Sequence, residues 1–275
     1  MCRWIAYSGE PIYLEQLVTK PVHSLVRQSM DAEMYYGMDG SLWSVNADGT
    51  GVGWYSERSE PGLFRDEAPA WNNENLHEIC KQVQAKIMMA HVRASTSGTV
   101  QKSNCHPFKH QNWLFQHNGH IGAFEAIKQE LHHDIAPDLY PEIKGTTDSE
   151  TFFYLAITYG LKDDPKEGLK KAINHIKEII ESHEIEPDLN FSCALSDGHK
   201  LYTLRYATKD TANSQFYSSK PECFMDLGAE AAKIPENSTV LVSEPLDRLS
   251  DKWTEIPQNS FVTIDGKDVE VEEFI

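Results

Sequence analysis

The sequence predicts an α+β domain in which strands at both ends of the chain flank two central helices. Three observations indicate this class: apolar runs of strand length before residue 120, helical spacing of apolar residues between residues 147 and 180, and further strand-like runs with turn dipeptides after residue 189. Strands and helices do not alternate, which argues against βαβ units. The 275 residues, 40% of them hydrophobic, suffice for a sizeable core, and we expect residues 1–275 to form a single domain.

The first part of the chain is predicted to consist mainly of strands. A short buried strand is expected from Cys2 to Tyr7, and the apolar runs Gly51–Tyr55 and Lys86–Val92 have strand length. The run Asn112–His117 is another, and it is closed by Asn118-Gly119. Because this pair readily takes positive φ, we expect a tight turn there.

Two helices are predicted in the middle of the chain. Thr147-Asp148-Ser149-Glu150 has the form of a capping box and precedes apolar residues, so a helix is expected to begin after Thr147. Asp164-Pro165 is expected to open a second helix. Its apolar residues recur at helical spacing along one face: Leu169, Ala172, Ile173, Ile176, Ile179 and Ile180.

The last third of the chain returns to strands. They are expected over residues 190–196, 200–206, 239–243 and 261–264. Asp197-Gly198 predicts a hairpin turn between the first two, and Asp265-Gly266 predicts another turn. The acidic tail Asp268–Glu273 is interpreted as a solvated edge strand rather than an interaction tail.

The charge balance excludes several classes of function. With 25 basic and 42 acidic side chains, the formal net charge is −17, which disfavours general binding to nucleic acids or to anionic membranes. No stretch is long and apolar enough to span a bilayer, and the N-terminus lacks the apolar core of a secretion signal. The five cysteines are scattered without a CxxC pair, so neither a disulfide framework nor a zinc ribbon is indicated. We therefore expect a cytoplasmic protein.

Cys2 is the first candidate for chemistry. Initiator methionine is normally removed before a small residue, which would leave Cys2 with a free α-amine. One residue would then carry a thiol nucleophile and a base whose ordinary pKa of about 7.7–8.0 suits proton transfer at neutral pH. The alternative is a small hydrophobic residue buried at the start of a strand.

Three other segments carry groups that such a nucleophile requires. Arg93 ends an apolar run, is followed by hydroxyl residues that include Thr96, and has the planar fork that binds a carboxylate. Asn118 and the N–H of Gly119 can converge on an oxyanion, and Asp148 can meet an ammonium group. Each segment also has a structural interpretation: an ion pair, a turn, and an ordinary acidic residue in the first turn of a helix.

Taken together, these segments resemble the class II glutamine amidotransferases, a branch of the N-terminal-nucleophile hydrolases. Each motif is weak alone, but their order and joint presence along nearly the whole chain make the resemblance specific. The motifs are Met1-Cys2-Arg3, Asn46–Trp54, Ala90–Arg93, Asn104–Phe108, His117–Gly119 and Thr147–Glu150, and Ser243–Leu246 resembles the stand-alone members.

The resemblance implies a four-layer αββα sandwich that hydrolyses the side-chain amide of glutamine. It assigns the nucleophile and its base to Cys2, and it implies a γ-glutamyl thioester that water then hydrolyses. The other roles that it implies are an oxyanion hole from Asn118 and Gly119, binding of the α-carboxylate by Arg93 with Thr96, and binding of the α-ammonium by Asp148.

Departures from the family pattern leave the substrate open. Ala94 and Ser97 differ from the residues that usually surround this arginine in synthase-linked members, so other γ-glutamyl compounds, such as thiol-histidine biosynthetic intermediates, remain candidates. We expect a small-molecule substrate, no cofactor and no metal. A separate synthase is a candidate consumer of the ammonia. The alternative is a catalytically silent regulatory protein that binds glutamine or a γ-glutamyl compound.

Two rival sites also follow from the residues. His106, His110, His117 and His120 lie near Cys105 and include the ligand types of a zinc site. Their spacing does not imply convergence, because His106 precedes a proline and His117 falls within a strand. Cys105 beside His106 is a rival nucleophile, but neighbours in an extended segment point to opposite faces.

Overall fold

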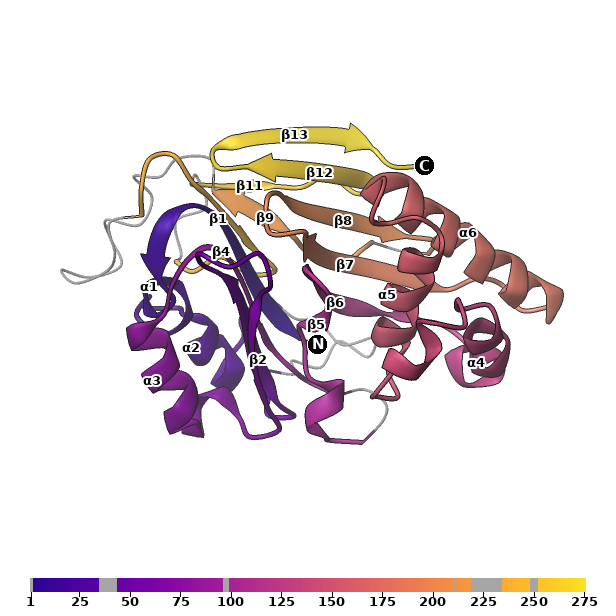
Figure 1. Ribbon diagram of the computed structural model, residues 1–275, viewed down its shortest axis with the longest axis horizontal. Coiled ribbons are helices and arrows are strands. Elements are labelled where there is room, and N and C mark those ends of the chain that lie inside the picture. Colours follow the sequence, from indigo (N-terminus) through magenta and orange to yellow (C-terminus); the bar gives the residue numbers. More distant parts are fainter. Residues whose placement is uncertain (1, 35–43, 96–98, 210, 219–233, 248–251) are drawn as a thin grey trace.

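Two antiparallel sheets lie face to face between two layers of helices in the computed structural model (Figure 1). The structure describes residues 2–34, 44–95, 99–209, 211–218, 234–247 and 252–275. Its arrangement confirms the αββα sandwich. None of the helices in these ranges is long and apolar enough to cross a membrane.

The first sheet contains the N-terminal strand at its centre. Within the described residues it has seven strands in the order β11-β9-β10-β1-β4-β2-β3. Their bounds are β1 Arg3–Tyr13, β2 Thr50–Tyr55, β3 Gly62–Asp66, β4 Gln84–Val92, β9 Phe216–Ser218, β10 Thr239–Val242 and β11 Trp253–Glu255. The helices α1 (Glu15–Val18), α2 (Leu25–Met30) and α3 (Glu74–Gln82) cover its outer face (Figure 1).

The second sheet is covered by the three longer helices. Its six strands in the described residues follow the order β13-β12-β8-β7-β6-β5. Their bounds are β5 Phe108–His110, β6 Trp113–Ile121, β7 Leu189–Ser196, β8 Leu201–Ala207, β12 Ser260–Asp265 and β13 Asp268–Glu273. The covering helices are α4 (Phe124–His133), α5 (Asp148–Thr158) and α6 (Pro165–Ser182). Short 3-10 turns span Ala70–Asn72, Lys102–Asn104 and Tyr140–Glu142.

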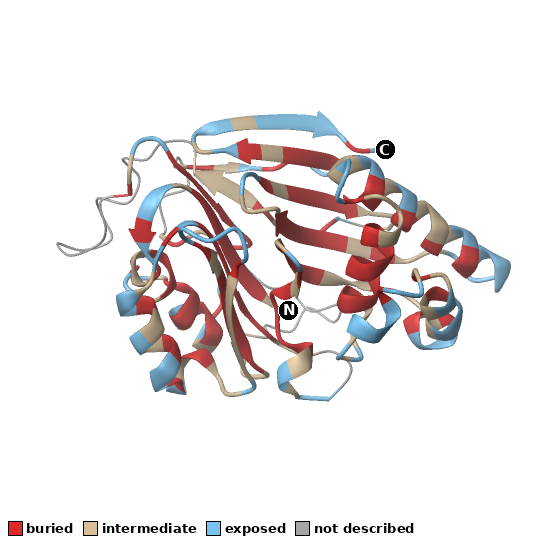
Figure 2. Ribbon diagram, viewed as in Figure 1, coloured by how far each residue is buried: buried red, intermediate tan, exposed pale blue. Residues whose placement is uncertain are grey.

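Strand alternation sorts the apolar side chains into three layers of core. Along β1, Trp4 and Ala6 pack between the sheets, whereas Ile5 and Tyr7 pack against the helices of the first layer. The central strands of both sheets are therefore buried on both faces, whereas the edge strand β13 is mostly exposed (Figure 2). A side chain that follows the Trp4 pattern faces the space between the sheets.

Most of the predicted elements are confirmed. Helix α5 begins after Thr147, whose Oγ1 accepts a hydrogen bond from the N–H of Glu150 at 3.2 Å. Helix α6 begins at Pro165, and Gly198 forms the hairpin turn between β7 and β8 with φ of +89°. The acidic tail is the edge strand β13, and its side chains are mostly exposed.

The predicted turn at Asn118-Gly119 is wrong. Strand β6 continues through both residues, which pair with Ser192 and Phe191 of β7. Neither has positive φ, and the chain turns only afterwards, at Ala123 with φ of 59°. Pairing with a whole neighbouring strand outweighs the local turn preference of the dipeptide.

Candidate active site

Cys2 lies at the start of β1 and shares the face of Trp4 and Ala6, which points between the sheets. Because Arg3 pairs with Val92 in the antiparallel register, Cys2 lies beside Arg93 at the end of β4. Its thiol donates a long hydrogen bond of 3.6 Å to the carbonyl oxygen of Ala94. Burial raises the pKa of the Cys2 thiol, and the N-terminal charge, the bond to Ala94 and the charges of Arg93 and Arg3 offset this only in part. The thiol is therefore protonated at neutral pH and needs a base before it can attack.

Arg93 is buried, and both its backbone N–H and its carbonyl oxygen form hydrogen bonds. Its N–H donates to Gly49 O at 2.8 Å, and its carbonyl oxygen accepts from Asp48 N at 2.9 Å. Its guanidinium donates to Ser95 Oγ at 3.0 Å and to Thr99 O at 3.4 Å. The carboxylate of Asp48 also accepts from Ser95 N at 2.7 Å, so one residue positions the arginine and the segment after it.

Asn118 enters the same space from the second sheet. Two residues on the same face of β6 show how the strand crosses the first sheet. The side-chain amide of Gln116 donates to Ile5 O at 3.0 Å. Leu114 packs between the sheets against Gly53, which pairs with Met89 of β4. Asn118 lies two residues beyond Gln116 along this face, in the direction in which β6 approaches the start of β1. Asn118 is 4% exposed, and its side-chain amide has no hydrogen-bond partner in the part of the chain that the structure describes.

Gly119 has no room for a side chain. A Cβ atom there would lie 1.8 Å from Asn190 O and 2.4 Å from His117 Nε2. That imidazole packs on the outer face of the sheet, where Nε2 lies 3.0 Å from Asn190 O and Nδ1 lies 2.9 Å from Ser149 Oγ. The histidine thus links β6, β7 and the start of α5, and it fixes the backbone around Asn118.

Asp148 occupies the first position of α5 and is oriented by the backbone. Its Oδ2 accepts from Ile121 N at 2.9 Å, and its Oδ1 accepts from Ser149 N at 2.7 Å. These bonds join the start of the helix to the end of β6. They leave further lone pairs on the carboxylate, which can accept additional donors.

Residues in the recognised motifs that had no predicted role organise this site. Besides Asp48, the buried Asn104 bonds Thr99 O at 3.0 Å, Thr146 Oγ1 at 3.1 Å and Thr146 N at 2.8 Å. It thereby connects the segment after Arg93 to the segment before Asp148. In the sequence, only their position within the family motifs indicated that Asp48 and Asn104 belong to the site. Thr96, predicted to bind substrate, lies outside the described residues.

The rival nucleophile lacks an activating environment. Cys105 is fully buried, and its thiol donates to Asp66 O at 3.3 Å. Burial raises its pKa to about 11 despite the nearby arginines. Its neighbour His106 stacks instead on His91, with ring centroids 4.3 Å apart, and burial holds the pKa of His106 well below its usual range.

The four clustered histidines diverge. The ring of His110 packs edge-on against Tyr154, and His120 Nε2 lies 3.1 Å from a carboxylate oxygen of Asp188. His106 and His117 have the separate partners described above. Across the described ranges, no group of three or more His, Cys, Asp or Glu side chains is placed to hold a metal ion.

The fold and the comparisons with known proteins place the chain among the class II glutamine amidotransferases. The family of class-II glutamine amidotransferases matches residues 36–272, and the chain belongs to it. It is 34% identical to "Probable glutamine amidotransferase DUG3" of Saccharomyces cerevisiae, over 96% of this chain and 82% of the yeast protein. A shorter match is 30% identical to γ-glutamyl-hercynylcysteine sulfoxide hydrolase of Mycolicibacterium smegmatis, over 43% of this chain and 51% of that protein.

Solved structures agree with this assignment. A glutamine aminotransferase class-II domain protein from Silicibacter pomeroyi superposes with a TM-score of 0.73 and 32% identity over 99% of both chains. The glutamine phosphoribosylpyrophosphate amidotransferase of B. subtilis has a TM-score of 0.62 and 14% identity. It matches all of this chain and 49% of its own, and at that identity it supports the fold alone.

Proposed function

We propose that this protein hydrolyses the side-chain amide of glutamine, or of a related γ-glutamyl compound, through a thioester on Cys2. One observation carries the proposal: the register of β1 and β4 brings Cys2 beside Arg93, and the bond from Gln116 to Ile5 O lays the face of β6 that carries Asn118 against β1. Two relatives support the chemical class, because one is named a probable glutamine amidotransferase and the other a γ-glutamyl-hercynylcysteine sulfoxide hydrolase.

The proposed reaction has two steps. After removal of Met1, the α-amine of Cys2 accepts the thiol proton, and the sulfur attacks the amide carbon. The C–N bond breaks, the proton passes to the departing nitrogen, and ammonia or an amine leaves. Water then attacks the thioester and releases glutamate and the thiol. A separate synthase is the proposed consumer of the ammonia.

The remaining residues act on charge that the substrate carries or develops. Asn118 and the N–H of Gly119 stabilise the oxyanion of both tetrahedral intermediates. Arg93, with Thr96, binds the α-carboxylate through a two-pronged contact. Asp148 binds the α-ammonium, and its orientation by two backbone N–H groups supports this role.

The requirement for a free amine gives the most direct test. Forms with and without Met1 are prepared, verified by mass, and assayed for glutamate release from glutamine and other γ-glutamyl compounds. Only the processed form should turn over, because an amide nitrogen cannot accept a proton near neutral pH. Cys2→Ser should be folded and nearly inactive, whereas Cys105→Ser should be active. Equal activity of the two forms would contradict the mechanism, and glutamine binding without turnover would instead support a silent binding protein.

A further inference from the structure

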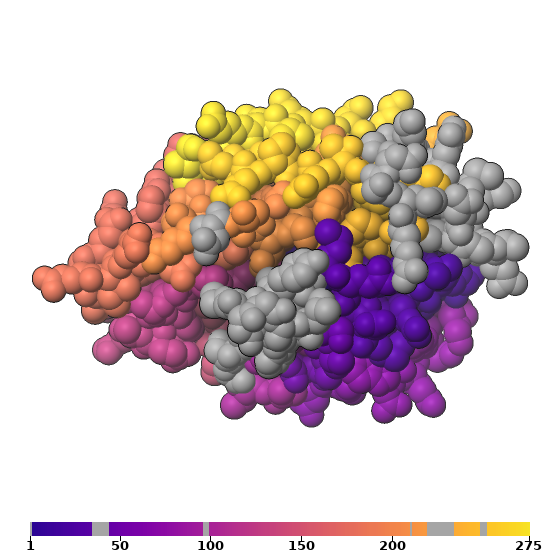
Figure 3. Space-filling model, turned by 180° about the vertical axis from the view of Figure 1, so that it is seen from behind, coloured from indigo at the N-terminus to yellow at the C-terminus, as the bar shows by residue number. Residues whose placement is uncertain are grey.

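The segment Ser243–Leu246 belongs to the recognised motifs, yet no step of the proposed reaction uses it. It follows β10, which pairs with β1 in the register Ile5 to Val242. Ser243 extends this pairing, because its N–H donates to Trp4 O at 3.0 Å and its Oγ accepts from Trp4 N at 2.9 Å. The space-filling view from behind shows the N-terminal part of the chain, in indigo, bordering C-terminal residues in orange and yellow (Figure 3). The motif therefore contacts the strand that carries Cys2.

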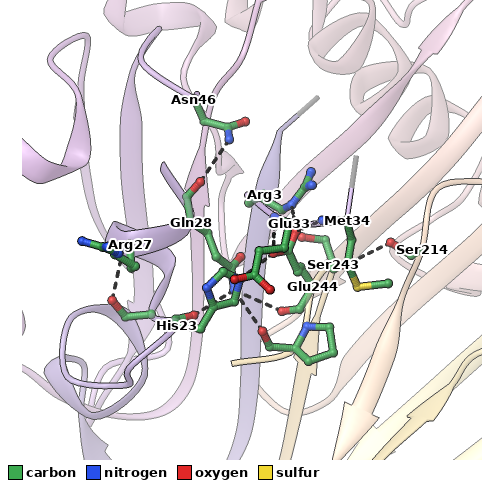
Figure 4. A network of polar contacts seen from close by, with 12 residues as sticks. Arg3, His23, Arg27, Gln28, Glu33, Met34, Asn46, Ser214, Ser243 and Glu244 are labelled. Atoms are coloured by element: carbon green, nitrogen blue, oxygen red, sulfur yellow. Dashed lines mark hydrogen bonds and ion pairs between the residues drawn. The ribbon is translucent and has the colours of Figure 1, made fainter. Parts of the chain in front are cut away.

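Glu244 is the centre of a buried network next to that strand (Figure 4). Its side chain is 2% exposed and accepts four hydrogen bonds. The donors are Arg3 Nε at 2.6 Å, His23 Nε2 at 2.5 Å, Glu33 N at 2.8 Å and Met34 N at 3.1 Å. Burial alone would raise its pKa, but the hydrogen bond from His23 and the charge of Arg3 prevail and lower the pKa to about 2. Glu244 is therefore ionised at neutral pH.

Arg3 connects this carboxylate to the nucleophile's own residue. While its Nε donates to Glu244, its Nη1 donates to the carbonyl oxygen of Cys2 at 3.0 Å. The arginine is 3% exposed and lies on the helix side of β1, as Ile5 and Tyr7 do. Cys2 points to the opposite face, between the sheets, so the network acts on the Cys2 backbone from the side away from the substrate.

We propose that Glu244 is a positioning residue that fixes the Cys2 peptide through Arg3 and so orients the thiol and α-amine toward the substrate. This inference rests on the proposed function. Once Met1 is removed, no preceding peptide restrains Cys2, and the peptide plane shared with Arg3 becomes its main backbone anchor. The Arg3 guanidinium holds that plane through the carbonyl oxygen, and Ser243 holds the next residue, Trp4. A displacement of about 1 Å at a reacting group costs on the order of a hundredfold in rate.

The test uses Arg3→Lys and Glu244→Gln in the full-length processed protein. A lysine keeps the charge beside Glu244 but lacks the fork that reaches both the carboxylate and Cys2 O. Each variant should lower kcat roughly 10- to 100-fold, with KM for glutamine changed less than about threefold, because Arg93 and Asp148 are untouched. Since Glu244 acts through Arg3, the double variant should lose much less than the product of the two single losses.

The matched control is Arg205→Lys. Arg205 is also a buried arginine that bridges a carboxylate, Glu255 at 2.7 Å, and a main-chain carbonyl, here that of Ile256. The Arg205→Lys variant should have a lower melting temperature and an unchanged kcat. Arg3→Lys retains the buried charge pair, so it suffices for the test if Glu244→Gln does not fold.

Three outcomes would overturn the positioning role, and a fourth would overturn both proposals. Wild-type kcat in folded Arg3→Lys, with Cys2→Ser inactive, would reject the positioning role and leave the proposed function intact. Losses that multiply in the double variant, or that appear in KM alone, would reject it as well. Full activity of Cys2→Ser would instead remove the nucleophile itself, and both proposals with it.

Discussion

Replacing Asn118 by Ala should slow turnover by roughly 100- to 1,000-fold, the usual cost of one oxyanion donor. This corresponds to about 2.7–4 kcal/mol of activation free energy. The free energy of unfolding should change much less, because the side-chain amide of Asn118 makes no hydrogen bond within the described residues. Asn118→Ala is therefore expected to lose activity without a comparable loss of stability.

Gln116→Ala is the matched control, two residues earlier on the same face of β6. Its amide donates to Ile5 O across the two sheets at 3.0 Å, and both groups are buried. Removing the donor leaves that carbonyl without this bond, at a cost of about 1–3 kcal/mol in the free energy of unfolding. Turnover should fall by no more than a few-fold, because Gln116 is bonded within the core.

Both variants are measured by steady-state release of glutamate and by urea unfolding. We expect Asn118→Ala to be slow and stable, and Gln116→Ala to be active and destabilised. Unaltered turnover in a folded Asn118→Ala protein would refute the oxyanion role. A large stability loss in the same variant would show that Asn118 has a structural bond, and that our placement of its amide is wrong.

Four further predictions concern the substrate pocket and the core around it. Arg93→Lys should raise KM for glutamine although the charge is retained. Asp148→Asn should impair γ-glutamyl amides that have a free α-ammonium far more than N-acylated analogues. Equal losses for the two substrate types would show that Asp148 only caps its helix. Gly119→Ala should destabilise the fold by at least about 1–3 kcal/mol, because its Cβ would lie 1.8 Å from Asn190 O; an unchanged urea midpoint would contradict this packing. Burial lowers the pKa of His91 to about 3, so the folded chain excludes a proton that the unfolded chain binds below about 6.5. Unfolding free energy should therefore fall as the pH is lowered from about 6.5 toward 3, and a His91→Gln variant with the same pH profile would refute the assignment.

The local features that the sequence predicted are those set by residues within a few positions of one another. The cap at Thr147, the helix start at Pro165 and the turn at Gly198 all depend on side chains or backbone angles in one short segment. Alternation along β1 likewise follows from the two-residue period of a strand. The identity of the candidate site residues also came from the sequence, through the order of their motifs.

Only the tertiary structure decided what those residues meet. The strand conformation of Asn118-Gly119, the bond between His117 and Ser149, and the contact of Glu244 with Arg3, which is 241 positions away, all depend on strand register and layer packing. Register is selected by the burial of whole faces of a sheet, because a slip of one residue would turn every side chain to the other face. That choice is made by contacts between distant segments, so no short stretch of this sequence contains the information that brings Cys2 beside Arg93.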